Sequence, residues 1–258
     1  MRIEMGVDPL AKIGFTSWPF VHVPDEYNTT FSCDRQWLVE AVTKMLTSYK
    51  LRDTSIINLM WSDVGAGKTH TLLNLKYRAA QMGFDSCVYF ELPNGVATFS
   101  EVARAFVNAV GLESLLTMFG NNSSVFMSSA IIDQLCRAAY TGHNTEHAAR
   151  AWVDGSATTA DCRILGIPRA LTNEQAISIV QTVATAMKRG SPERTIILVD
   201  EFQRVAARSK STAAAIQASL CSLINRMPKH LTLILSFQAP PSDKLPGWFD
   251  ASLSSRAG

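Results

Sequence analysis

The sequence has few cysteines, and none of them forms a CxxC pair. The five are scattered along the chain, at Cys33, Cys87, Cys136, Cys162 and Cys221. Disulfide frameworks and zinc sites need paired or clustered cysteines, so this odd and widely spaced set argues against both. We expect reduced, buried thiols.

A long apolar run is also lacking. The longest runs, 56–61 and 195–199, fall far short of the roughly 20 residues that cross a bilayer. The first thirty residues contain no basic segment followed by an apolar one, which is the mark of a secretory signal. We therefore predict a cytoplasmic protein with no membrane contact.

Neither sign of charge is in clear excess. The 24 lysines and arginines against 22 acidic residues give a net charge of +2, which is too small to indicate nucleic-acid binding by itself. Hydrophobic residues make up 47% of the chain, a composition typical of globular proteins. A chain of 258 residues can bury one substantial core, so one domain with an insertion is the simplest organisation.

Short apolar runs alternate with segments of helical periodicity. Buried strands are predicted at 55–61, 86–92, 195–200 and 231–236, and helices at 34–49, 69–82, 99–110 and 212–226. Strands separated by helices imply a parallel sheet with right-handed crossovers. The predicted fold class is therefore α/β, with three layers in the order helix, sheet, helix.

The segment from about 115 to 190 contains no convincing strand. Its periodicity predicts several helices, interrupted at 120–122, 142–144 and 166–168. We expect this helical insertion to precede the strand at 195–200. The predicted division is an N-terminal arm and entry helix over 1–50, followed by the core over 51–258.

A glycine-containing loop joins the first predicted strand to the next helix. Ser62-Asp-Val-Gly-Ala-Gly-Lys-Thr69 matches GxxxxGK[ST] at its last three positions, with a serine where the first glycine usually stands. Backbone amides of such a loop cradle phosphates, so the predicted nucleotide contacts are Asp63, Val64, Gly65, Ala66, Gly67, Lys68, Thr69 and His70. The alternative is a glycine-rich turn that happens to precede Lys-Thr.

Two residues of this loop carry the predicted chemistry. The Lys68 ammonium would neutralise the β- and γ-phosphates, and the Thr69 hydroxyl would ligate Mg²⁺. The predicted cofactors are accordingly ATP and Mg²⁺.

An acidic pair follows the strand at 195–200. The carboxyl ends of parallel strands face the phosphates, so Asp200 is the predicted magnesium ligand. Glu201 is placed to accept a proton from the attacking water as a general base. The alternative is a buried strand that ends in an acidic turn.

Two further catalytic candidates carry weaker signals. Ser236 ends the predicted strand 231–236 and could orient the water or contact the γ-phosphate, with Gln238 as its substitute. Arg256 could serve as an arginine finger toward a neighbouring subunit, or could be a lone surface arginine. His143 and His147 are spaced as HxxxH without a third ligand, so we expect solvated histidines and no metal site.

Taken in order, these residues resemble a known group. The segment Phe31-Ser-Cys-Asp-Arg-Gln36, the loop ending Gly-Lys68-Thr69, the Asp200-Glu201 pair, Ser236 and Ser254-Ser-Arg256 resemble AAA+ ATPases of the origin-recognition initiator clade. These are P-loop proteins with Walker A and Walker B motifs, in which a catalytic glutamate follows the Walker B aspartate. Trp152-Val-Asp-Gly155 and Leu165-Gly-Ile167 further resemble bacterial P-loop proteins of phage-exclusion (BREX-like) systems.

The resemblance implies a nucleotide bound at a subunit interface in a ring or helical homo-oligomer. It also implies action on DNA or a DNA-bound protein, in phage defence, replication or transposition, and it places Phe20–Val23 beside the adenine. Such a core continues past the arginine into a fifth strand and a helical lid, whereas this sequence stops at Gly258, so we expect the lid to be absent from it. Either the sequence is a fragment of a longer protein, or the fold closes in an unusual way.

Three functions stay open on the sequence. The first is an oligomeric ATPase that remodels or loads a DNA-associated complex. The second is a switch or scaffold in which ATP binding holds a signalling conformation with little turnover, which the serine at position 62 and the large insertion would allow. The third is a degenerate P-loop scaffold that binds no nucleotide, against which Lys68, Thr69, Asp200 and Glu201 together argue.

Overall fold

The structure is a computed structural model that describes residues 36–121, 123–188, 194–240 and 244–255. Its centre is a sheet of four parallel strands: β1 (Ile56–Ser62), β2 (Cys87–Glu91), β3 (Thr195–Asp200) and β4 (Leu231–Gln238). The strand order is β1-β4-β3-β2. Because all four strands are parallel, their carboxyl ends meet at one edge. The predicted α/β class and parallel sheet are confirmed.

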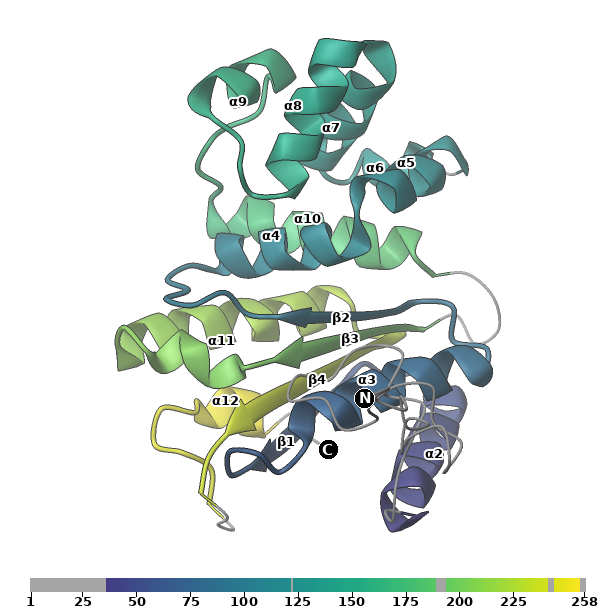
Figure 1. The fold of residues 1–258 in the computed structure, drawn as a ribbon, viewed down its shortest axis with the longest axis vertical. Coiled ribbons are helices and arrows are strands. Elements are labelled where there is room, and N and C mark those ends of the chain that lie inside the picture. Colours follow the sequence, from purple (N-terminus) through teal and green to yellow (C-terminus); the bar gives the residue numbers. More distant parts are fainter. Residues whose placement is uncertain (1–35, 122, 189–193, 241–243, 256–258) are drawn as a thin grey trace, which may run out of the picture.

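One face of the sheet is covered by α2 (Gln36–Leu51) and α3 (Lys68–Gln81). Every second residue of a strand points to the same face, and here these residues are apolar over most of each strand. They pack against buried side chains of the two helices in one cluster, which includes Leu46, Leu72, Ile56, Leu198 and Ile234. Figure 1 shows both helices on this side of the sheet.

The opposite face is covered by α4 (Phe99–Val110), α10 (Asn173–Ala186) and α11 (Lys210–Arg226). The start of α4 is fixed by a capping box, in which Glu101 accepts hydrogen bonds from the backbone of Ala97 and Thr98. The helix then buries Phe99 and Phe106, and Phe106 lies against Phe90 of β2. Sheet and helices thus form three layers.

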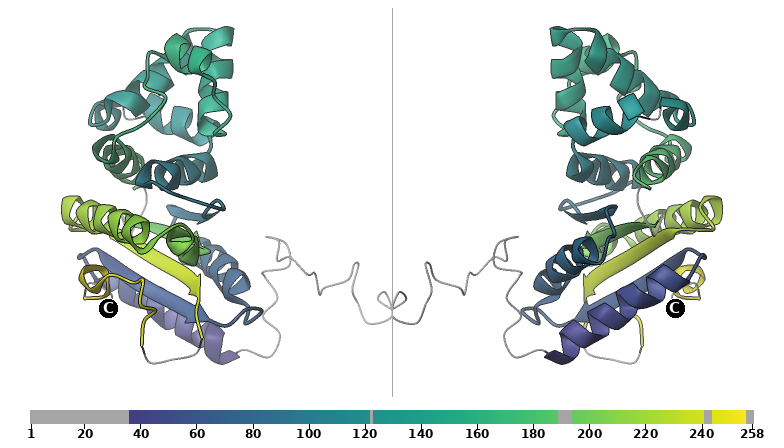
Figure 2. Two further views of the ribbon diagram at one scale, coloured as in Figure 1. Left: turned by 90° about the vertical axis from the view of Figure 1, so that its left-hand side faces the viewer. Right: turned by 90° about the vertical axis from the view of Figure 1, so that its right-hand side faces the viewer.

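A group of helices between α4 and α10 extends this outer layer. They are α5 (Leu112–Asn121), α6 (Ser123–Phe126), α7 (Ala130–Thr141), α8 (His143–Val153) and α9 (Thr159–Leu165). Figures 1 and 2 show them stacked beyond α4 and α10, on the side away from the sheet. Their buried residues, such as Leu135 and Trp152, belong to the same hydrophobic cluster as the sheet residues Val88 and Leu233. The helical group therefore shares its core with the sheet.

The WxxG and LGI stretches noted in the sequence both mark helix ends. After α8, the amides of Gly155 and Ser156 donate to the carbonyls of Trp152 and Ala151, and Gly155 has a φ of 77°. After α9, Gly166 has a φ of 66°, and the Gly166 and Ile167 amides donate to carbonyls of the last helical turn. These are Schellman caps, which place a left-handed residue after a helix. Both stretches have a structural reason to exist.

Two short elements remain. The 3₁₀ turn η2 (Phe202–Ala206) follows β3, and α12 (Ala251–Ser254) follows β4 in the sequence. Over the described residues, no single helix is long and apolar enough to cross a membrane. The helices α4 and α5, which meet at a sharp bend, are together long and apolar enough for a broken membrane span, but several of their residues lie in the core. The cellular compartment stays a prediction.

Candidate functional site: a glycine loop facing an acidic strand end

The glycine loop lies between β1 and α3, at the carboxyl edge of the sheet. Gly65 and Gly67 have φ angles of 75° and 83°, a left-handed conformation that glycine adopts without strain. Gly67 is the residue that precedes α3, and the Thr71 amide makes the first intrahelical bond, to the Gly67 carbonyl. The amides of the first helical turn therefore precede the hydrogen-bond ladder and face the loop, an arrangement that suits an anion.

Lys68, the first residue of α3, folds its side chain back over the loop. Its ammonium donates to the carbonyls of Ser62, at 3.0 Å, and Asp63, at 2.9 Å. Val64 at the tip of the loop is largely exposed. The loop therefore holds a positive charge against its own backbone, directly beside the first turn of the helix.

Thr69 and Asp200 meet across the edge of the sheet. The Thr69 hydroxyl donates to Asp200 Oδ2 at 2.6 Å, and the Tyr89 hydroxyl lies 3.3 Å from the same oxygen. The other oxygen, Oδ1, accepts the Glu201 amide at 2.9 Å. Asp200 is almost fully buried, so these three donors compensate for the loss of its hydration.

Tyr89 was not among the residues predicted from the sequence. Burial, with the nearby Asp200 carboxylate second, raises the pKa of Tyr89, so its hydroxyl stays protonated as a donor. The signal in the sequence is that Tyr89 and Glu91 are two residues apart at the end of a predicted strand, a spacing that puts both side chains on one face. Both side chains share the sheet face of Asp200, since Glu91 and Asp200 are partners in register.

Glu201 lies just outside β3 in an unusual backbone conformation. Its φ of 56° is left-handed, which costs a non-glycine residue about 1–2 kcal/mol. Its Oε2 accepts the amide of Gln203 at 2.8 Å and lies 3.5 Å from the guanidinium of Arg204. Within the described part of the chain, Oε1 takes no hydrogen bond. The carboxylate is thus held by one oxygen and open at the other.

The position of Ser236 corrects the sequence prediction. β4 does not end there but continues to Gln238, because β1 runs beside it as far as Ser62 and the pairing is maintained. Ser236 is therefore inside the sheet and fully buried, and its hydroxyl has no hydrogen-bond partner among the residues that the structure describes. Register places it beside Asp200, since Val199 pairs with Leu235. Gln238, the exposed residue, is the one that stands at the strand end.

Several predicted residues are not brought into this site. Arg256, Phe20–Val23 and Cys33 lie outside the described residues. His143 and His147 are on α8, and no group of three His, Cys, Asp or Glu side chains comes together in the described ranges. The remaining four cysteines are free thiols, three of them buried.

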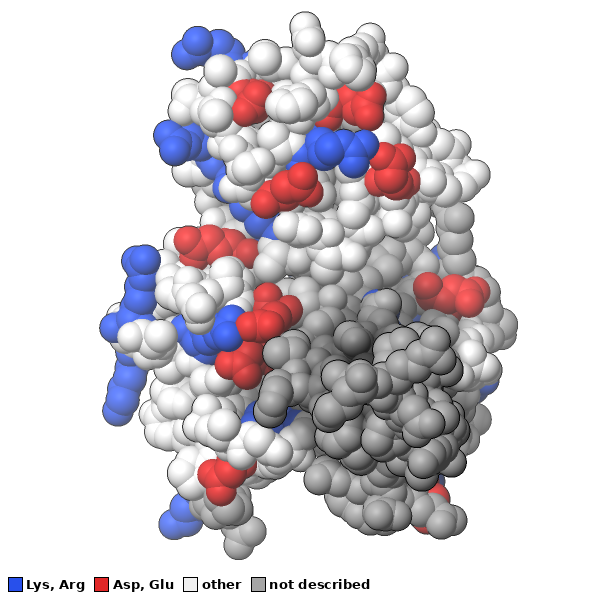
Figure 3. Space-filling view, viewed as in Figure 1, with Lys and Arg blue, Asp and Glu red and all other residues white. Residues whose placement is uncertain are grey.

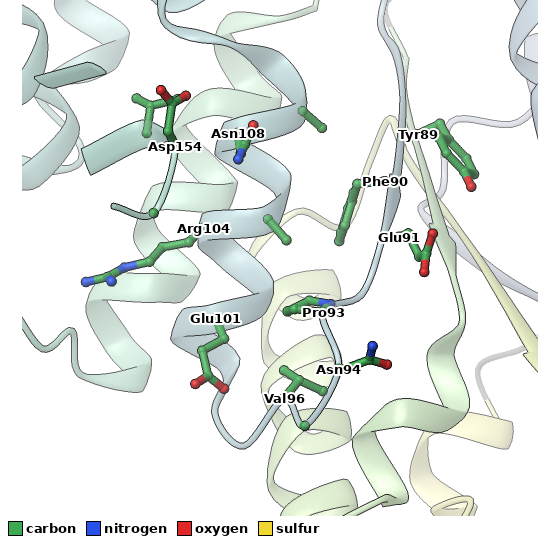
Figure 4. A pocket seen from close by; sticks show the side chains of 15 residues that line it. Tyr89, Phe90, Glu91, Pro93, Asn94, Val96, Glu101, Arg104, Asn108 and Asp154 are labelled. Atoms are coloured by element: carbon green, nitrogen blue, oxygen red, sulfur yellow. The ribbon is translucent and has the colours of Figure 1, made fainter. Parts of the chain in front are cut away.

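A cavity of about 640 Å³ lies beside the edge strand β2, close to this site. It is bounded by the end of β2, the following turn, α4 and the segment after α8. Figure 4 shows Phe90 pointing toward α4, while Tyr89 and Glu91 point to the other side of the strand. Glu91 pairs there with Arg204 at 2.6 Å. On the molecular face in Figure 3, acidic and basic side chains lie interspersed.

Comparisons with known proteins add little. No family model matches the chain, and no curated protein matches it. Among solved structures, the chain is similar to one titled "Structure of C. elegans PCH-2", with a TM-score of 0.39 and 13% sequence identity. The match covers 90% of this chain and 44% of that chain. Because the TM-score and the identity are both low, we draw no functional conclusion from it.

The topology itself is informative. A glycine loop between the first strand and its helix lies beside an acidic residue that ends β3, and β4 runs between these two strands. The chain has a three-layer α/β fold in which the glycine loop and the acidic strand end meet at the carboxyl edge of one parallel sheet.

Proposed function

We propose that this chain binds ATP with Mg²⁺ and hydrolyses it, as an ATPase of the AAA+ type. The observation that carries the proposal is the 2.6 Å contact between the Thr69 hydroxyl and Asp200 Oδ2, which joins residues 131 positions apart in the sequence. A hydroxyl at the start of a helix and a carboxylate at the end of a buried strand are the two protein oxygens that a phosphate-bound Mg²⁺ requires.

The loop suits a triphosphate. A Cβ added at Gly65 would meet no atom within 4 Å, so the space above the loop backbone is open. The first-turn amides of α3 and the Lys68 ammonium are two sources of positive charge beside this open space. Together they would bind and orient the phosphates.

The residues around Asp200 also fit a magnesium ion with its water ligands. Thr69 and Asp200 offer hard oxygens, and on the same sheet face Ser236 adds a buried hydroxyl that no described residue hydrogen-bonds. A buried orphan hydroxyl is costly unless something accepts or donates to it, which a bound water would do. Mg²⁺, when bound, would neutralise charge on the phosphate oxygens.

Glu201 would act as the general base. It follows Asp200 directly, and its free Oε1 could accept a proton from the attacking water. The carboxylate is partly exposed, so it is accessible to solvent.

Assembly and a DNA-linked role belong to the same proposal. An arginine finger can be supplied by a neighbouring subunit, and Arg256 in that role would make turnover depend on a homo-oligomer. Exposed Arg208 and Lys210, which follow the acidic motif, support contact with DNA or a DNA-bound partner.

The test is ATP hydrolysis measured against protein concentration, with and without double-stranded DNA. Wild type should turn over ATP with a rate per subunit that rises with concentration or DNA. Glu201→Gln should still bind ATP but lose about 100-fold or more in kcat, because the base is gone. Lys68→Ala should lose binding as well. Glu40→Gln and Lys44→Ala, on the outer part of α2, are the matched controls.

Two results would redirect the proposal. Tight ATP binding without turnover under all conditions would favour a nucleotide-dependent switch. Absence of ATP binding in wild type, or identical binding in Lys68→Ala, would overturn the assignment of the loop.

A further inference from the structure

A single glutamine side chain connects Glu201 to the end of the neighbouring strand. Gln203 Nε2 donates to Glu201 Oε2 at 2.8 Å, while Gln203 Oε1 accepts the backbone amide of Gln238 at 2.9 Å. Both polar ends of one amide group are therefore used.

These two contacts fix the orientation of the amide. The carboxylate can only accept and the Gln238 amide can only donate, so a flipped Gln203 would place its oxygen against Glu201 and its NH₂ against the amide. Both hydrogen bonds would then be lost at once. Gln203 thus holds the Glu201 carboxylate in one defined place relative to β4.

The turn η2, which carries Gln203, is held in place by the packing of its apolar side chains. Its neighbours Phe202 and Val205 are fully buried, and the Phe202 ring lies 6.1 Å from Trp248 and 6.3 Å from Phe249, centroid to centroid. Packing of this kind leaves the turn little freedom. Gln203, which is only partly buried, faces the other way, toward the acidic pair.

The end of β4 also touches the phosphate loop. The residue after Gln238 is Ala239, whose amide lies 3.3 Å from the Ser62 carbonyl. That same carbonyl accepts the Lys68 ammonium. One strand end therefore contacts the start of the loop on one side and, through Gln203, the Glu201 carboxylate on the other.

Arg204 provides a second contact from the opposite side. Its guanidinium pairs with Glu91 at 2.6 Å, donates to the Leu92 carbonyl, and lies 3.5 Å from Glu201 Oε2. Gln203 and Arg204 act on the same carboxylate oxygen, one tied to β4 and the other to β2. The shorter contact is that of Gln203.

We propose that Gln203 is the positioning residue of the water-activating glutamate: it fixes Oε2 of Glu201 to the strand end that contacts the phosphate loop, and so leaves Oε1 aimed for proton transfer. This inference rests on the proposed ATPase function. It predicts an effect on turnover and little effect on nucleotide binding, since the two hydrogen bonds of the Gln203 side chain go to Glu201 and Gln238 and not to the loop.

The experiment compares kcat and KM of Gln203→Met and Gln203→Glu with those of wild type. Methionine keeps the length of the side chain without the hydrogen bonds, so kcat should fall about 10- to 100-fold, the cost of a base displaced by roughly 1 Å. KM should change less than about threefold, because ground-state binding is untouched.

Gln203→Glu separates the hydrogen bond from the shape of the side chain. It keeps the size of the side chain but replaces the Nε2 donor with an acceptor, so the contact to Glu201 Oε2 is lost, and kcat should fall while KM stays within about threefold of wild type. Gln81→Glu, at the far end of α3, is the same substitution at an exposed position and should leave kcat unchanged.

The outcomes separate the two proposals. If wild type has no turnover, or Glu201→Gln keeps it, the ATPase function has failed and the role of Gln203 with it. If Glu201→Gln abolishes turnover while both Gln203 variants keep wild-type kcat, only the positioning role is wrong. Circular dichroism and ATP affinity equal to wild type show that the variants are folded.

Discussion

At the scale of single residues, Arg194 connects several segments by hydrogen bonds at the edge of the sheet opposite the phosphate loop. This arginine is buried just before β3, and its guanidinium donates to the carbonyls of Arg52, Thr54 and Leu231 and to the Thr232 hydroxyl. Burial lowers the pKa of Arg194, yet an arginine keeps its charge in proteins. The side chain therefore joins the entry of β1 to β3 and β4 through hydrogen bonds that replace water.

Replacing Arg194 with methionine should destabilise the protein. The change removes the buried charge but leaves three backbone carbonyls without their donors, which costs about 2–4 kcal/mol. Urea denaturation of Arg194→Met and of the exposed control Arg137→Met measures this difference. Equal midpoints for the two variants would show that the network contributes no net stability.

At the scale of elements, two helices between α4 and α10 end at glycines whose backbone conformations differ. The α9 cap needs Gly166 in a left-handed conformation, with Leu165 and Ile167 buried on either side. By contrast, Gly142 between α7 and α8 has a φ of 169°, which is extended backbone that any residue adopts. Two glycines at helix ends therefore carry different constraints.

Gly166→Ala should lower the free energy of unfolding by about 1–2 kcal/mol, because a Cβ is strained in the left-handed region. The added methyl would also come within 2.3 Å of Gln134 Nε2, the end of a flexible side chain that must move. Gly142→Ala is the matched control, since its Cβ would meet only Thr145 Oγ1 at 3.8 Å. Thermal or chemical denaturation compares the two, and a control as unstable as Gly166→Ala would disprove the conformational argument.

At the scale of the whole molecule, the helical group and the sheet belong to one core. Phe126, Leu135 and Trp152 of the outer helices are fully buried in the same cluster as Leu235 of β4. The Glu174–Arg226 ion pair adds a contact between α10 and α11, and the pairing lowers the pKa of Glu174. We therefore expect sheet and helices to unfold together.

Calorimetry should show one transition with equal calorimetric and van't Hoff enthalpies, as for a two-state domain. Gly166→Ala, in the helical group, and Arg194→Met, in the sheet, should both shift this one transition to lower temperature. Two resolved transitions, each moved by one variant alone, would mean that the helical group is a separate folding unit.

The elements were predictable where local periodicity is strong. β3 at Thr195–Asp200 and α4 at Phe99–Val110 have the predicted boundaries, because each is a continuous apolar run or an amphipathic repeat with a clear start. The end of β4 was predicted two residues too early, since strand length depends on β1 alongside it. No local signal records that partner.

The sequence by itself determined the alternation of strands and helices, the glycine loop and the acidic pair, because apolar spacing and residue type are local properties. Only the tertiary structure decided that Thr69 touches Asp200, that Tyr89 joins them, and that Gln203 and Arg204 of η2 connect Glu201 to β4 and to β2. The physical reason is that these contacts join residues far apart in sequence or depend on the unusual backbone at Glu201, and each forms only when parallel strands bring their carboxyl ends to one edge.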